Sequence, residues 1–206
     1  MKTLVIALAV ISIAALAQEY QFPGWTCTDA AQFQAQIPLA PTPLQKATVA
    51  FMAVLVQNPP ASLAEAIPAI DAAINQYAPE TTPAVRIGEH KKCALRLQKW
   101  TPELLAYCQA NPSGFDIHVA SRIPSAWSVQ RLQECLLTTS GTNTPLAVSA
   151  GITALNDYAI KGEFITAAEA KEAFIKIDLF YTAKLADDKD KWAPIVAKIR
   201  TLLERY

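Results

Sequence analysis

Residues 166–186, with the sequence TAAEAKEAFIKIDLFYTAKLA, decide the fold class because they read as one complete amphipathic helix. Thr166 and Glu169 have the spacing of a capping box, in which each side chain bonds a backbone N–H at the helix start. Apolar residues then recur at helical spacing on one face: Ala170, Phe174, Ile177 and Tyr181. Such a stripe must pack against other elements, so the segment predicts a helix in a packed helical protein.

Similar start signals recur along the chain. Threonine caps a helix well and proline suits its first position, so threonine–proline pairs predict helix starts. These pairs are Thr42-Pro43, Thr82-Pro83, Thr101-Pro102 and Thr144-Pro145. Ser62 with Glu65 gives a second capping box, and helix-breaking residues such as Asn58-Pro59-Pro60 and Gly162 follow apolar stretches. The predicted helices span about residues 28–36, 43–57, 63–78, 83–99, 102–110, 125–138, 145–161, 167–186 and 190–206.

Signals for β-structure are poor. The sequence has no asparagine–glycine or aspartate–glycine hairpin and no sustained alternation of apolar and polar residues. Pro68 lies inside its predicted helix, so we expect a kink or a later start there. The last two predicted helices should pair antiparallel across the charged turn of residues 187–191, which should lie in solvent.

The N-terminus reads as a secretory signal peptide of residues 1–17. Lys2 precedes a continuous apolar run, and Ala15 and Ala17 give a cleavage pattern of small residues. The run is shorter than the roughly 20 residues needed to span a bilayer, so we expect no transmembrane anchor. Residues 18–206 should then form a single, secreted, extracellular domain.

The charge balance argues against a nucleic-acid partner. The chain has 18 basic and 18 acidic residues, and its formal net charge is zero. Binding to phosphates needs a clustered excess of lysine and arginine, which this sequence lacks.

Four cysteines follow the signal peptide: Cys27, Cys93, Cys108 and Cys135. An exported chain meets oxidising conditions, so two disulfides are expected. Cys93 and Cys108 flank a predicted helix–helix turn, which favours a bond between them and leaves Cys27 for Cys135. The alternative joins Cys27 to Cys93 and Cys108 to Cys135. The sequence therefore predicts an all-α, single-domain bundle of about eight or nine short helices stapled by two disulfides.

A ligand cavity is suggested by one unusual helix. Residues 49–56 are apolar without interruption, which is typical of a central helix surrounded by others. The alternative is a helix that lines a cavity together with tryptophans near predicted helix ends. The candidate ligand-binding residues are Phe51, Met52, Leu55, Trp100 and Trp127.

No constellation of residues predicts catalysis. Ser121, Ser125 and Ser128 lie near His118 in sequence, but no nucleophile-elbow motif accompanies them. His90 lies in a charged run, Glu89-His90-Lys91-Lys92, that reads as the solvent face of its helix. The cysteine and histidine spacing is not that of a metal site, so we expect neither metal nor cofactor, and no enzymatic activity.

These observations lead to an expected function. A secreted helical chain without a catalytic constellation is expected to be a binding or carrier protein for an apolar small molecule or an extracellular partner protein. The mean hydropathy of +0.18 is a modest argument for the apolar ligand, because the signal peptide contributes much of it. The alternative is a secreted effector, such as a venom or salivary component or an enzyme inhibitor.

Overall fold

The computed structural model describes residues 29–138 and 144–206. Within these two ranges every regular element is an α-helix, ten in all, and no strand occurs. Contacts divide the chain into two compact units, residues 1–81 and residues 82–206. The all-α prediction is therefore confirmed, whereas the predicted signal peptide and Cys27 lie outside the described residues.

Unit 1 is built on a central apolar helix. Its described helices are α2 (Ala30–Gln36), α3 (Pro43–Gln57) and α4 (Leu63–Tyr77). Helix α3 packs against both α2 and α4. Thr42 caps α3 by accepting a bond from the N–H of Gln45, as its threonine–proline start predicts. Most of the apolar run in α3 is buried and Val54 is exposed, so the run serves mainly as the core of this unit.

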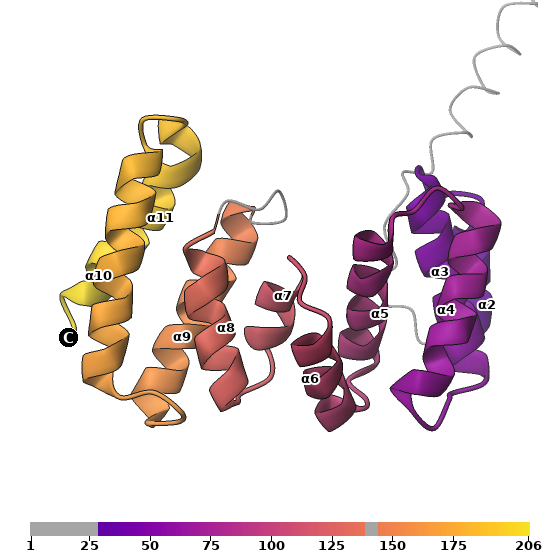
Figure 1. Ribbon diagram of the computed structural model, residues 1–206. Coiled ribbons are helices and arrows are strands. Elements are labelled where there is room, and N and C mark those ends of the chain that lie inside the picture. Colours follow the sequence, from indigo (N-terminus) through magenta and orange to yellow (C-terminus); the bar gives the residue numbers. More distant parts are fainter. Residues whose placement is uncertain (1–28, 139–143) are drawn as a thin grey trace, which may run out of the picture. The chain divides into compact units, whose positions relative to one another are not determined.

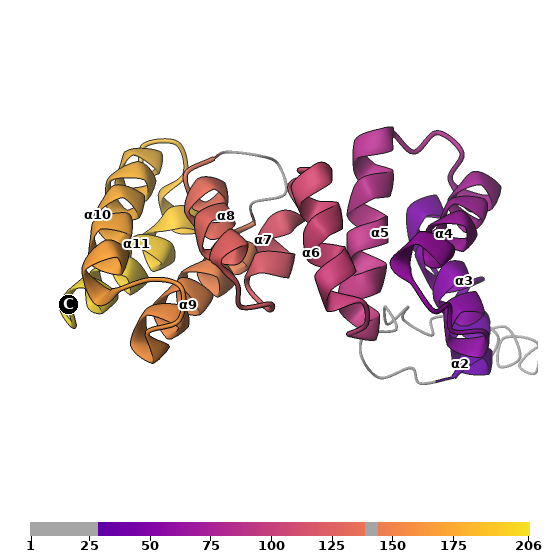
Figure 2. The same ribbon diagram turned by 60° about the horizontal axis from the view of Figure 1, so that its bottom comes forward.

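The described part of unit 2 contains seven helices, which Figures 1 and 2 show in two views. They are α5 (Pro83–Leu97), α6 (Thr101–Ala110), α7 (Asp116–Ala120), α8 (Ala126–Leu136), α9 (Pro145–Lys161), α10 (Ala167–Lys184) and α11 (Lys189–Leu203). The predicted pair of α10 and α11 lies side by side in both views. The turn between them is exposed, and Asp188 caps α11.

Helix α9 is the centre of unit 2, because it packs against α7, α8, α10 and α11. Their buried side chains form one continuous apolar core, which includes the predicted stripe of α10. Gly151 lets α9 approach its neighbours closely. A Cβ atom at this position would lie 3.3 Å from side-chain atoms of Leu132 and Leu136 on α8. Tyr158 adds a buried bond, since its hydroxyl donates to the carbonyl of Ala120 on α7 at 2.8 Å.

The helix boundaries largely follow the predictions, with three departures. Helix α7 has no predicted counterpart, because its five residues are too few to show helical periodicity. Helix α6 begins at Thr101 after Trp100, which has a left-handed φ of 57°, so Thr101 is not the cap. Pro68 lies inside α4, which nevertheless begins at Leu63, so the later start is wrong.

The prediction of two disulfides is wrong. No disulfide joins any two of the described cysteines, which are buried thiols at Cys93, Cys108 and Cys135. The geometry of α5 explains why the favoured bond between Cys93 and Cys108 is absent. Lys91 of α5 points toward Asp116 and bonds it. Cys108 lies on that same side of α5, because the charge of Asp116 also acts on its thiol. Residues two apart on a helix point about 200° away from each other, so Cys93 lies on the opposite side of α5.

Enlarging Gly151 should destabilise the protein. Gly151→Val would push branched methyl groups into leucine side chains that already lie within contact distance, at a cost of about 1–3 kcal/mol in unfolding free energy. Gly88→Ala is the control, because a Cβ there meets only Phe115 Cβ at 3.9 Å. This control should be neutral or more stable by up to about 1 kcal/mol, since alanine favours helix. Urea unfolding of both variants provides the measurement, and an unchanged Gly151→Val midpoint would contradict the close packing of α9.

Candidate functional site

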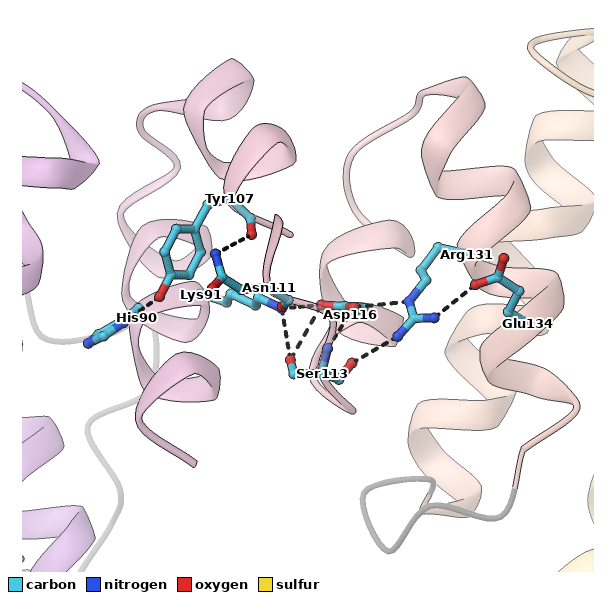
Figure 3. A network of polar contacts seen from close by, with 8 residues as sticks. All are labelled: His90, Lys91, Tyr107, Asn111, Ser113, Asp116, Arg131 and Glu134. Carbon is cyan, nitrogen blue, oxygen red and sulfur yellow. Dashed lines mark hydrogen bonds and ion pairs between the residues drawn. The ribbon is translucent and has the colours of Figure 1, made fainter. Parts of the chain in front are cut away.

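A buried ion pair lies at the centre of the polar contacts of unit 2 (Figure 3). Lys91 of α5 donates from Nζ to Oδ1 of Asp116, the first residue of α7, at 2.6 Å. Both side chains are fully buried, with 0% of either exposed. Lys91 also donates to the carbonyl of Asn111 and, at 2.9 Å, to the hydroxyl of Ser113. All three ammonium protons therefore have acceptors, as a buried charge requires.

The Asp116 carboxylate is bonded through its second oxygen as well. Oδ2 accepts from the backbone N–H of Ser113 at 3.0 Å and from Nε of Arg131 on α8 at 2.9 Å. Arg131 reaches toward solvent and also donates to Glu134 at 2.8 Å. One carboxylate thus connects α5, α7 and α8, and the chain of contacts ends at Glu134 on the surface.

The charged run around His90 is not a solvent face, contrary to its interpretation from sequence. Glu89, His90 and Lys91 are 5%, 6% and 0% exposed. Nδ1 of His90 lies 2.8 Å from the hydroxyl of Tyr107 on α6. Polar and charged residues bury in this way when each has a partner. Glu89 pairs with Lys92 on the same helix, whereas the partners of His90 and Lys91 lie 17 to 25 positions along the chain.

Removing Asp116 should be much more destabilising than removing an exposed acid. Asp116→Ala leaves Lys91 buried without its counter-charge, at a cost of about 3–5 kcal/mol. Glu172→Ala removes an equally short ion pair, Glu172–Lys176 at 2.7 Å, that is mostly exposed. Its loss should cost about 0.5 kcal/mol or less.

The double variant Lys91→Met/Asp116→Leu completes this test. It should unfold at higher urea concentration than Asp116→Ala, because it leaves no buried lysine unpaired. Equal midpoints for Asp116→Ala and Glu172→Ala would contradict the role assigned to the buried pair.

A groove opens on unit 2 between the end of α8, the loop before α10 and the first turns of α10. Its volume is about 420 Å³, within the range of roughly 300–1,000 Å³ usual for small-molecule sites. Its buried lining residues, here called the floor, are all apolar, and its exposed lining residues, here called the rim, are all charged except Phe164. The lining residues are Val129, Gln133, Glu134, Leu137, Phe164, Ile165, Glu169, Glu172, Ala173, Lys176 and Ile177.

The loop before α10 places an aromatic ring at the groove. Gly162 ends α9 with a left-handed φ of 67°, and the N–H of Glu163 donates back to the carbonyl of Tyr158. Phe164 then also takes a left-handed φ, 63°, and its side chain stays 56% exposed. A bulky residue rarely adopts this backbone conformation, which costs of order 1–3 kcal/mol. The loop thus keeps a strained, exposed phenylalanine beside the groove.

The charges on the groove are fixed by local bonds. Hydrogen bonds from Arg131 and Gln130 hold the pKa of Glu134 below its usual value. Bonds from the side chain and the backbone N–H of Thr166 lower the pKa of Glu169 in the same way. The Thr166–Glu169 bonds are those of the predicted capping box, which is confirmed. Both glutamates are therefore anionic at neutral pH.

The ligand residues suggested by the sequence lie elsewhere. Phe51, Met52 and Leu55 share the buried face of α3 in unit 1. Trp100 and Trp127 belong to unit 2, where Trp127 packs against the apolar core. None of the five lines the groove. The groove residues gave no motif in the sequence, because they come from two separate segments, residues 129–137 and 164–177, which only the folded chain brings to one groove.

The serines near His118 have local structural roles. Ser121 donates to the carbonyl of Ile117, Ser125 caps α8, and Ser128 donates to the carbonyl of Ile123. Burial lowers the pKa of His118, whose ring packs at a tilt of 37° against Phe115 with centroids 4.9 Å apart. Within residues 29–138 and 144–206, no group of three or more histidine, cysteine, aspartate or glutamate residues could hold a metal ion.

The buried thiols should be unreactive in the folded protein. Burial raises the pKa of Cys93 and of Cys108 to about 12, and that of Cys135 to about 11. Thiolates are the reactive form, so at pH 8 the reactive fraction of Cys93 is about a thousandfold below that of an ordinary cysteine. Iodoacetamide should label Cys93 and Cys108 readily in denaturant and very slowly in the native state. Peptide mapping measures both rates, and a recovered Cys93–Cys108 disulfide peptide would contradict the structure.

Among the described helices, none is long and apolar enough to cross a membrane. Comparisons with protein-family models, curated proteins and solved structures give no match to this chain. A functional interpretation therefore depends on the groove and its surroundings.

Proposed function

We propose that this protein is a secreted, non-enzymatic binding protein that holds an apolar small molecule in the groove of unit 2. The observation that carries this proposal is the groove itself, which combines an apolar floor with a few polar groups at its rim. That combination is typical of ligand sites, where apolar contacts give affinity and polar groups fix orientation.

The placement of Phe164 supports the proposal. Burial of a phenylalanine ring is favourable, yet this ring stays mostly exposed and its backbone is in a strained conformation. A ligand in the groove would cover the ring and recover part of that apolar surface. The folded loop thus holds the ring in its binding position before a ligand arrives, despite the cost in backbone strain.

The groove provides for holding a ligand rather than transforming it. Its lining contains no serine, threonine, cysteine or histidine, and its three glutamates and one lysine are held in local hydrogen bonds and ion pairs. Secretion, the other half of the proposal, rests on the signal-peptide pattern of residues 1–17.

A second candidate function is binding of a partner protein, as expected of a secreted effector or inhibitor. Ile175 and Leu179 lie one helical turn apart on the solvent side of α10 and are 45% and 66% exposed. Neighbouring exposed apolar side chains are typical of protein-binding surfaces. Partner-protein binding would be favoured over small-molecule binding if the groove binds no small molecule.

Ligand binding tests the first proposal directly. The full chain is expressed with export, and the intact mass should show a mature protein that begins at Gln18. A neutral aromatic probe, 2-naphthalenemethanol, is then titrated by calorimetry, with NMR shifts to locate the site. Saturable binding with shifts confined to the groove is expected, and its absence would contradict the proposal.

Phe164→Ala should weaken this binding about tenfold, because it removes the aromatic contact at the groove. The matched control is Leu146→Ala, which removes an 82% exposed apolar side chain of α9 outside the groove. The control should bind like the unchanged protein. Equal affinities of the two variants would show that the probe binds elsewhere.

A further inference from the structure

We propose that the groove selects a particular ligand class, a small molecule whose apolar, preferably aromatic, body carries one protonated amine. This inference rests on the proposed function and names the ligand chemistry of the same site.

The charges of the groove leave one carboxylate without a cationic partner. The lining includes three glutamates and one lysine. Lys176 pairs with Glu172 at 2.7 Å, and Arg131, from outside the lining, pairs with Glu134 at 2.8 Å. Glu169 has no cationic partner among the described residues, since its bonds come from the neutral N–H and hydroxyl of Thr166. Its negative charge is therefore available to a ligand cation.

The end of α8 adds to this negative potential. Gln133, Glu134 and Leu137 line the groove from the last turn and the C-terminal cap of α8. The C-terminus of a helix carries a partial negative charge, which basic side chains often offset, and the last turn of α8 has no basic residue. At the start of α10 the helix end is positive, and Glu169 itself offsets that charge. A cation thus meets a favourable potential on the α8 side.

The ring of Phe164 suits the same ligand. Aromatic faces attract ammonium groups at contact distance, and they also pack against flat apolar bodies. Lys176 is not free to serve as the internal cation, because it is paired with Glu172. The ring of Phe164 can therefore contact either the ammonium group or the aromatic body of a bound amine.

The size of the groove favours a single small molecule. Its volume of about 420 Å³ lies near the lower end of the range of roughly 300–1,000 Å³ for small-molecule sites. An apolar ring system with one short aminomethyl group fits that volume. The apolar floor would hold the ring, and the polar rim would place the amine near Glu169.

Three probes with the same ring test the charge preference on the full mature chain. They are 2-naphthylmethylamine, 2-naphthalenemethanol and 2-naphthoate, measured by calorimetry at low and at high salt. We expect the amine to bind about three- to tenfold more tightly than the alcohol at low salt, and the carboxylate more weakly than the alcohol. High salt should reduce the preference for the amine and leave the alcohol unchanged.

Glu169→Gln assigns the preference to its residue. Glutamine keeps the side-chain bonds of a capping box but removes the charge, so the helix start should be retained. This variant should lose most of the preference for the amine and bind the alcohol as before. Glu204→Gln, an exposed acid at the end of α11 outside the groove, is the matched control and should change neither affinity.

The outcomes separate the two proposals. If the alcohol binds in the groove and the amine binds no more tightly, the charge inference is overturned and the binding function stands. If Glu169→Gln retains the full preference, the assignment to this carboxylate is also overturned. If none of the three probes saturates, the binding function itself fails, and the inference fails with it.

Discussion

The buried pair of Lys91 and Asp116 is the constraint on which the first half of unit 2 depends. Two full charges without solvent contact are tolerated only when every donor and acceptor is bonded. Lys91 meets this condition with three acceptors within residues 111–116, and Asp116 meets it with donors from the turn at Ser113 and from Arg131. The positions of α5, α7 and α8 are therefore coupled, because moving any one of them would break a charged bond in the interior.

The helices could be predicted from the sequence because their signals are local. Threonine, serine and glutamate at helix starts act within one turn, and the bonds at Thr42, Thr144 and Thr166 are the expected ones. The apolar stripe of α10 was equally visible, since its residues recur every three or four positions. Short α7 was missed because five residues cannot show a period.

The buried ion pair could not be predicted, since it joins residues 25 positions apart. A lysine among charged neighbours reads as a solvent face until tertiary packing supplies an acceptor. The sequence favours a Cys93–Cys108 bond for a similar reason, because the two cysteines lie on either side of a predicted helix–helix turn. Orientation decided otherwise, because α5 presents Lys91 toward Asp116, and Cys93, two residues later, points to the opposite side.

The groove and the buried pair belong to one chain of contacts, which links the Glu134 side of the groove to the interior. Glu134 lines the groove and accepts from Arg131, which is itself held by the buried Asp116. An exposed ion pair alone orders a side chain weakly, because its partners lose conformational freedom for little gain. Here the buried Asp116 holds Arg131 in position, and Arg131 in turn holds Glu134. The negative charge of Glu134 is therefore already paired with Arg131. Glu169, which also lines the groove, accepts bonds only from neutral groups and has no cationic partner among the described residues.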